Sequence, residues 1–183
     1  LFALSLAAVA CLLSASGVIV MPVTSAILAG STSDPLLSSG DMALDQILGG
    51  GYRAGSAVLL AGPTGVGKTT LAALFARAAC DRRENVLYVS FEEPPESMFM
   101  SLQQIGVDLQ RLVDAGQLTM LARMPEATVP EAHLLDMLQT IDTIRARHVV
   151  VDAISAVRRM GSEQAAFDVL VRLIAYCKRE GIT

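Results

Sequence analysis

A glycine-rich segment carries the clearest chemical signal in this sequence. Residues 62–69 read GPTGVGKT, which fits the pattern GxxxxGK followed by Ser or Thr without a mismatch. Glycines allow a turn in which consecutive backbone N–H groups point to one spot and bind an anion. A strand-like run precedes the segment and a helical run follows it, so the helix N-terminus adds its positive dipole end. The pattern predicts a site for the phosphates of a nucleoside triphosphate; the alternative is a structural turn without nucleotide.

Three side chains are expected to complete a site for the phosphates and a metal ion. Lys68 would contact the β- and γ-phosphates, and the hydroxyl of Thr69 would bind Mg²⁺. Asp152 ends the apolar run HVVVD, so it would hold Mg²⁺ through a water molecule at the same edge of a parallel sheet. The alternative is that Asp152 only caps the turn that follows its strand.

A general base has to come from another part of the sequence. Many P-loop ATPases carry a Glu directly after the metal-binding Asp, but Ala153 stands there. Glu92 and Glu93 follow a strand-like run at 85–91, whose carboxyl end would meet the phosphate site at one edge of the sheet. We expect one of them, preferably Glu92, to orient or deprotonate a water or hydroxyl nucleophile. The alternative is a charged turn that starts a helix.

Strand-like and helix-like segments alternate along the chain. This alternation predicts an α/β fold with a mostly parallel sheet and helices on both of its faces. The last residues reach the expected start of a further strand, so we expect C-terminal strands to be missing from the sheet. In the last helix, Phe167, Leu170, Val171, Ile174 and Cys177 fall at helical spacing and predict one buried stripe. The expected strands are 17–22, 56–61, 85–91, 118–122 and 148–152, and the expected helices are a turn at 44–45 and the runs 71–80, 96–105, 108–115, 131–146 and 163–180.

The composition excludes several classes of protein. The 183 residues are 52% hydrophobic and 17% charged, which is too apolar for a disordered chain. The net charge of −4 argues against a free-standing nucleic-acid-binding protein, which usually carries a basic excess. Cys11, Cys80 and Cys177 form no CxxC pair, so they indicate reduced thiols in a cytosolic protein rather than a zinc site or a disulfide framework.

The N-terminal segment has several possible interpretations. Residues 1–33 contain no charged side chain. The apolar run 1–13 resembles the core of a secretory signal without its positive residues, and it is short for a transmembrane helix. Its alternatives are a strand or helix of a preceding domain, or an artefact at a fragment end. We therefore expect an uncertain apolar segment at 1–16, a strand and interdomain linker at 17–39, and a truncated domain at 40–183.

Short pieces of the sequence, taken together and in order, resemble the KaiC family of RecA-like P-loop ATPases over residues 17–183. The closest similarity is to the second of the two tandem KaiC domains, and the segment from residue 17 to residue 40 resembles the linker between them. Two features depart from the family: residues 1–16 do not resemble the end of a first KaiC domain, and Ala153 replaces the usual Ser. The matching pieces are Ser38-Ser39-Gly40, Leu44-Asp45, Gly49-Gly50-Gly51, the phosphate-binding segment 62–69, Phe91-Glu92-Glu93, Gly106-Val107-Asp108, Pro125-Glu126, His133-Leu134 and Val151-Asp152 with Ser155.

The resemblance implies cofactors, a site and an assembly. It implies ATP and Mg²⁺, with the metal at Thr69 beside the expected Asp152, and Glu92 and Glu93 as the catalytic pair acting with Lys68. It implies a cytoplasmic hexameric ring with nucleotide between subunits, and autokinase and autophosphatase activity on a Ser or Thr beyond Thr183. KaiA-like, KaiB-like or other signalling partners are expected, whereas nucleic acid and membrane partners are not. The nucleotide-binding residues are expected to be Gly62, Thr64, Gly65, Val66, Gly67, Lys68, Thr69 and Thr70.

Two other functions stay open at this point. A DNA-dependent recombinase of the RecA/RadA type shares the fold but needs basic DNA-binding loops, and the acidic balance speaks against it. A nucleotide-sensing scaffold would bind ATP and hydrolyse it negligibly.

Overall fold

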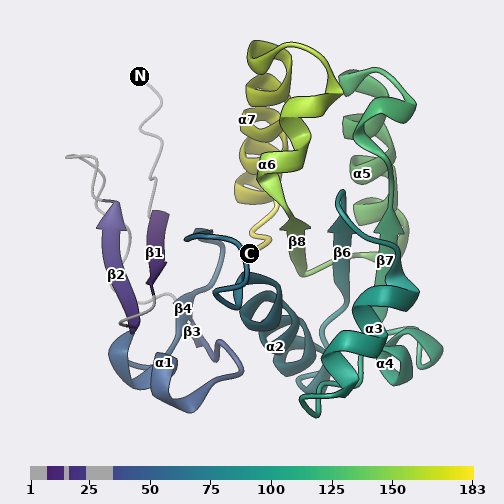
Figure 1. Cartoon of the computed structure of the whole chain (residues 1–183). Helices are drawn as coiled ribbons and strands as arrows, with labels where there is room; N and C mark the ends of the chain where they lie inside the picture. The colour runs from purple at the N-terminus through teal and green to yellow at the C-terminus, as the bar shows by residue number, and fades with distance from the viewer. Residues whose placement is uncertain (1–7, 15–16, 24–34) are drawn as a thin grey trace.

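The computed structural model describes residues 8–14, 17–23 and 35–183, and it shows an α/β protein (Figure 1). Strand β6 (Val86–Ser90) lies in the middle of a parallel sheet, between β7 (Leu118–Ala122) and β8 (His148–Asp152). β7 and β8 have the bounds that the sequence predicts, and β6 is one residue shorter at each end. Parallel pairing brings the carboxyl ends of the three strands to one edge of the sheet.

Helices cover both faces of this sheet because β6 is apolar on both sides. All five residues of β6 are buried. Successive strand side chains point to opposite faces, so Val86 and Tyr88 join one helix layer while Leu87 and Val89 join the other. The predicted architecture, a parallel sheet with helices on both faces, is confirmed. The first layer contains α2 (Lys68–Asp81), α3 (Pro95–Gln103) and α4 (Gln110–Asp114), and the second contains α5 (Pro130–Ile144) and α7 (Glu163–Arg179).

The strand that leads into the phosphate-binding segment lies in a second sheet. β5 (Ala57–Ala61) pairs in parallel with β1 (Ala8–Ser14), which pairs antiparallel with β2 (Gly17–Val23), the strand predicted at 17–22. β5 and β8 form no ladder with each other, and a cavity of about 660 Å³ lies between them. The predicted sheet is therefore divided in two. Part of the uncertain N-terminal segment and the predicted linker residues 29–34 lie outside the described residues.

Thr183 lies between the two sheets. Its backbone N–H donates to the carbonyl of Arg147 at 3.2 Å, and its carbonyl accepts from the N–H of Val149 at 2.9 Å. Its hydroxyl accepts from the N–H of Gly55 at 2.8 Å. The two backbone bonds have the pattern of a parallel ladder. Thr183 is therefore joined by hydrogen bonds both to β8 and to the turn that precedes β5.

Short elements between β2 and β5 pack on α2 through a small apolar cluster. β3 (Leu36–Leu37) pairs antiparallel with β4 (Tyr52–Arg53), so this part of the predicted linker is a strand. In α1 (Met42–Ile47), Asp45 accepts hydrogen bonds from the serines at 38–39. Burial works to raise the pKa of Asp45, but these hydrogen bonds lower it overall. The turn and α1 therefore form one hydrogen-bonded unit.

The predicted buried stripe on the last helix is wrong. Phe167, Val171 and Ile174 are 59%, 46% and 39% exposed. The buried line of α7 is instead Ala166, Val169 and Leu173 at i, i+3 and i+7, while Leu170 and Cys177 are only partly buried. Both lines have helical spacing, so periodicity alone cannot choose between them. Because Ala166 is small, α7 can approach the core closely along the line of Ala166, Val169 and Leu173.

Three short helical elements follow strand ends and were not predicted from the sequence. They are the turns η1 (Pro125–Ala127) and η2 (Arg158–Met160) and the helix α6 (Ile154–Val157), which begins directly after β8. None of the helices in the described part of the chain combines the length and the apolar composition needed to cross a bilayer.

Burial raises the pKa of the free thiols Cys80 and Cys177 to about 11, so both stay protonated near neutral pH.

Gly40 provides a test of how the turn before α1 packs on α2. Gly40 has φ +84, and a methyl group added there would lie 2.2 Å from the carbonyl oxygen of Leu74. Gly40→Ala should therefore lose about 1–3 kcal/mol more than the cost of the backbone angle, because it overpacks a contact with backbone. The matched control is Gly116→Ala, where φ is +71 and the added methyl meets nothing within 4 Å. Urea unfolding of both variants measures the difference, and equal losses would contradict the packing.

His148 should make the stability fall as the solution becomes mildly acidic. His148 is 3% exposed, and its Nε2 lies 2.9 Å from Oε2 of Glu84. Burial lowers the pKa of His148 below its ordinary 6.5, and the Glu84 carboxylate only partly opposes this. The unfolded chain therefore takes up a proton first as the pH drops below 6.5, which favours unfolding.

The measurement is the free energy of unfolding at about pH 7.5 and about pH 5.5, a range that spans the ordinary histidine pKa. His148→Leu should lose less stability across this range than the unsubstituted protein does. Burial tends to raise the pKa of Glu84, but its hydrogen bonds lower it below 4.5 overall, so its own titration lies beneath this range. An equal loss in both proteins would exclude His148 as the source.

Candidate functional site

The phosphate-binding segment forms a tight bend between β5 and α2. Gly65 and Gly67 have φ values of +81 and +99, in the left-handed region that residues with a Cβ atom adopt only at a cost. Gly67 is also the N-cap of α2, so no side chain caps this helix, and its first turn contains no acidic residue. By contrast, Asp41 caps α1 and Ser162 caps α7 through their side chains. The amide groups at the start of α2 are thus left for an anion, which fits a phosphate.

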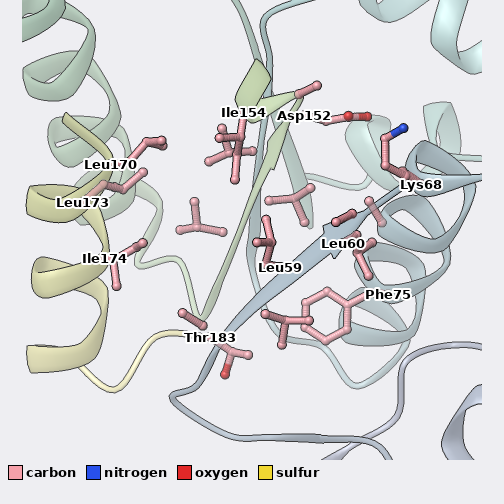
Figure 2. Close-up of a pocket in the computed structure, with 18 of the residues that line it drawn as sticks. Leu59, Leu60, Lys68, Phe75, Asp152, Ile154, Leu170, Leu173, Ile174 and Thr183 are labelled. Carbon is pink, nitrogen blue, oxygen red and sulfur yellow. The ribbon is translucent and has the colours of Figure 1, made fainter. Parts of the chain in front are cut away.

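Lys68 lies at the end of the cavity where this bend is found. Its ammonium group donates to the carbonyl oxygens of Gly62 at 3.0 Å and Pro63 at 2.9 Å, so it is held over the bend. Lys68 and Asp152 line the same cavity, and Figure 2 shows their charged ends close together at one end of it, with Thr183 at the other. A cation at the start of α2 and a carboxylate at the end of β8 therefore lie close together beside the phosphate-binding bend.

Asp152 is held by the neighbouring strand. It pairs with Ser90 in the β6–β8 ladder, and its backbone carbonyl accepts from the N–H of Phe91 at 2.8 Å. The hydroxyl of Tyr88 donates to its Oδ2 at 2.9 Å. Burial raises the pKa of Tyr88 well above its usual range and the charge of Asp152 raises it further, so this hydroxyl stays protonated.

The donor set near Asp152 fits Mg²⁺ better than a transition metal. The described residues contain no group of three or more His, Cys, Asp and Glu that could hold a metal by themselves. Mg²⁺ prefers oxygen ligands and is usually held by one or two protein groups together with phosphates and water. The hydroxyl of Thr69, in the first turn of α2, and the carboxylate of Asp152 supply that kind of set.

The two glutamates that follow β6 have different surroundings. Glu92 is exposed, and its Oε1 accepts a long hydrogen bond of 3.4 Å from the hydroxyl of Ser155, a residue that lines the cavity. Glu93 is half-buried, and its carboxylate accepts from the hydroxyl of Ser97 on α3 at 3.1 Å. The hydroxyl of Ser90 also donates to the backbone carbonyl of Glu93 at 2.7 Å. Glu92 is therefore the less constrained of the two, on the side of the cavity.

The residues expected from the sequence are brought together at the carboxyl ends of β5, β6 and β8. Gly62, Thr64, Lys68 and Asp152 line one cavity. The others of the set do not line it: Gly65, Val66 and Gly67 lie in the bend, Thr69 and Thr70 in the first turn of α2, and Glu92 and Glu93 after β6. The rest of the cavity is mainly apolar, with side chains such as Leu59, Leu173 and Ile174. The charged groups of Lys68 and Asp152 thus lie at one end of the cavity, while Ser56, Lys178 and Thr183 add polar groups to its lining.

The sequence analysis did not identify Tyr88 as a partner of Asp152. A signal was present, since Tyr88 stands in an otherwise aliphatic stretch two residues before Ser90. Period-two alternation places these two side chains on one face of β6. His133, another residue of the matching pieces, packs inside the protein: it is 2% exposed, and its Nε2 lies 3.0 Å from the carbonyl of Pro125.

Comparisons with known proteins agree with this site. The family model described as "ATPase: KaiC" matches residues 37–183, which includes the phosphate-binding bend, both glutamates and Asp152. The chain is 38% identical over 173 residues to the "Circadian clock protein KaiC2" of Synechocystis sp., covering 94% of this chain and 30% of that protein. It is 29% identical over 168 residues to the "Circadian clock oscillator protein KaiC" of Thermosynechococcus vestitus, covering 92% of this chain and 32% of that protein.

The similarity therefore extends over nearly the whole chain but over about a third of these relatives. The matched region coincides with the elements that carry the bend, the glutamates and Asp152. The chain belongs to the KaiC family of RecA-like ATPases.

Proposed function

We propose that this chain binds ATP with Mg²⁺ and hydrolyses it at the edge where β5, β6 and β8 end. The observation that carries the proposal is that Lys68 and Asp152 line one end of a single cavity beside the uncapped N-terminus of α2. A triphosphate needs positive charge, amide donors and a metal-binding carboxylate in one place. The positive charge and the amide donors come from residues 62–70, the carboxylate comes from Asp152, and these two distant segments of the sequence converge at this point.

The residues then have defined roles. The amides of the bend and of the first turn of α2 bind the phosphates, and Lys68 exchanges its carbonyl partners at Gly62 and Pro63 for phosphate oxygens. Thr69 and Asp152 hold Mg²⁺, which supplies charge neutralisation between the β- and γ-phosphates. Glu92 orients a water molecule or another hydroxyl and accepts its proton. Ser155 keeps the Glu92 carboxylate near the cavity.

The intact protein is proposed to be a serine/threonine autokinase that assembles into a hexameric ring with nucleotide between its subunits. The names of the relatives, circadian clock proteins, support a role in a clock or in related signalling. A cytoplasmic location and KaiA-like or KaiB-like partners are part of the same proposal. Detecting phosphate on a Ser or Thr after incubation of the whole protein with labelled ATP would test the kinase part alone.

Replacing the lysine of the bend tests nucleotide binding. Lys68→Ala removes a charge-assisted contact to phosphate, so the dissociation constant for ATP should rise at least about tenfold. Equilibrium dialysis or calorimetry measures it directly. Arg111→Ala, on the exposed surface of α4, removes a positive charge away from the cavity and is the matched control. Unchanged ATP affinity in Lys68→Ala would reject the proposed site.

Replacing the proposed base tests hydrolysis separately from binding. Glu92→Gln keeps the shape of the side chain but cannot accept the proton, so the turnover rate should fall about 10²- to 10⁴-fold while ATP still binds. Glu93→Gln should cost much less, because Ser97 already engages the Glu93 carboxylate. Glu96→Gln, in the first turn of α3, is the control for the loss of a nearby charge.

The outcome separates the remaining alternatives. Turnover that is negligible and insensitive to Glu92→Gln would favour a nucleotide-sensing scaffold. Turnover that rises on addition of DNA would favour a recombinase instead.

A further inference from the structure

We propose that Tyr88 is a positioning residue for the metal-binding carboxylate. Its hydroxyl fixes one oxygen of Asp152 and leaves the other for the metal ion and its water. The inference rests on the proposed function, because it assigns Tyr88 a role toward the same Mg²⁺. It adds a residue that lies outside the phosphate-binding bend and outside the pair of glutamates.

The register of the sheet places Tyr88 within reach of Asp152. Tyr88 pairs with Val150 in the β6–β8 ladder, and Ser90 pairs with Asp152. Residues two apart on a strand point to the same face, so Tyr88 and Asp152 lie diagonally on the face that α2 covers. The tyrosine side chain is long enough to cross one pair along the ladder. Its hydroxyl oxygen lies 2.9 Å from Oδ2 of Asp152.

The residues packed around Tyr88 hold its ring in one orientation. The residue is 0% exposed and packs among Ala73 and Ala76 of α2 and Met98 of α3. Close packing of this kind prevents the ring from swinging away. Within the described part of the chain, Asp152 is the hydrogen-bond partner of the Tyr88 hydroxyl. The donor is therefore held at a constant place at the end of β8.

The chemistry of a carboxylate makes this contact useful. An ionised carboxylate only accepts hydrogen bonds, so a fixed donor on Oδ2 sets the rotation of the whole group. Among the described residues, no hydrogen bond is made to Oδ1 of Asp152. A donor behind a metal ligand orients that ligand, and its loss typically weakens metal binding about 10- to 100-fold. Phenylalanine would fill the same space without the donor, so the role can be separated from packing.

The test measures how nucleotide binding depends on Mg²⁺. A fluorescent ATP analogue is titrated into the protein over a series of Mg²⁺ concentrations and in EDTA. In Tyr88→Phe, the half-saturating Mg²⁺ concentration should rise about tenfold, while the affinity in EDTA stays unchanged. Tyr176→Phe is the matched control, because its hydroxyl donates to a carboxylate, Asp142, away from the site, and it should change neither value.

Asp152→Asn provides a second measurement that does not depend on how Tyr88→Phe folds. It should raise the half-saturating Mg²⁺ concentration by itself, and adding Tyr88→Phe to it should have no further effect, because Tyr88 acts through Asp152. Additive effects would overturn the inference. So would an unchanged Mg²⁺ dependence in Tyr88→Phe, or an equal loss of affinity in EDTA.

The result also distinguishes this inference from the proposed function. If the unsubstituted protein binds no ATP analogue in either condition, the proposed function fails and the inference fails with it. If it binds the analogue in a Mg²⁺-dependent way and Tyr88→Phe behaves identically, only the role of Tyr88 is overturned.

Discussion

The parallel pairing of β6 with β8 is the constraint on which the candidate site depends. It sets Ser90 opposite Asp152, so the glutamates that follow β6 and the aspartate that ends β8 emerge at one edge. A shift of the register by one residue would turn Asp152 to the opposite face of the sheet, away from Tyr88 and α2. The bond from Phe91 N–H to the carbonyl of Asp152 extends this pairing one step past the strands. The chemistry at the edge is thus fixed by backbone hydrogen bonds before any side chain contributes.

The helix layers hold this pairing in place. One face of β6 packs on the alanine-rich α2 and on α3 and α4, and the other packs on α5 and α7. Because α2 also begins at the phosphate-binding bend, the burial of its apolar side positions the start of the helix as well. Packing energy that stabilises the fold therefore also determines where the phosphate amides lie. The core and the site share the same elements, and they depend on each other.

Much of this arrangement could be predicted because local patterns determine it. The bend has a specific sequence, and the apolar runs at 118–122 and 148–152 have the length and composition of buried strands, so their bounds were predicted correctly. The start of α2 near Lys68 was predicted from the phosphate-binding pattern, whereas helical composition alone indicated a helix from Leu71. Glycine at the cap and polar residues in the first turn hide a helix start from a search for apolar spacing.

What could not be predicted depends on neighbours that are distant in the sequence. The pairing of β5 with β1 rather than β8 depends on the whole chain, and no local sequence pattern indicates it. The buried face of α7 follows from the close approach that Ala166 permits, whereas a hydrophobic pattern favours the larger Phe167. Tyr88 resembled an ordinary core residue because its partner is 64 positions away.

The division of the strands into two sheets has a mechanical consequence. The bend and Lys68 follow β5, whereas Asp152 ends β8 and Glu92 follows β6, and Lys68 and Asp152 lie at one end of a largely apolar cavity between the two sheets. A molecule that touches Lys68 and Asp152 at once bridges the two sheets, which Thr183 also links through its hydrogen bonds to Gly55 and Val149. The free energy of ligand binding then adds to the stability of the protein, and loss of the ligand would weaken the association of the two sheets. Binding of a small ligand would in this way make the protein more rigid.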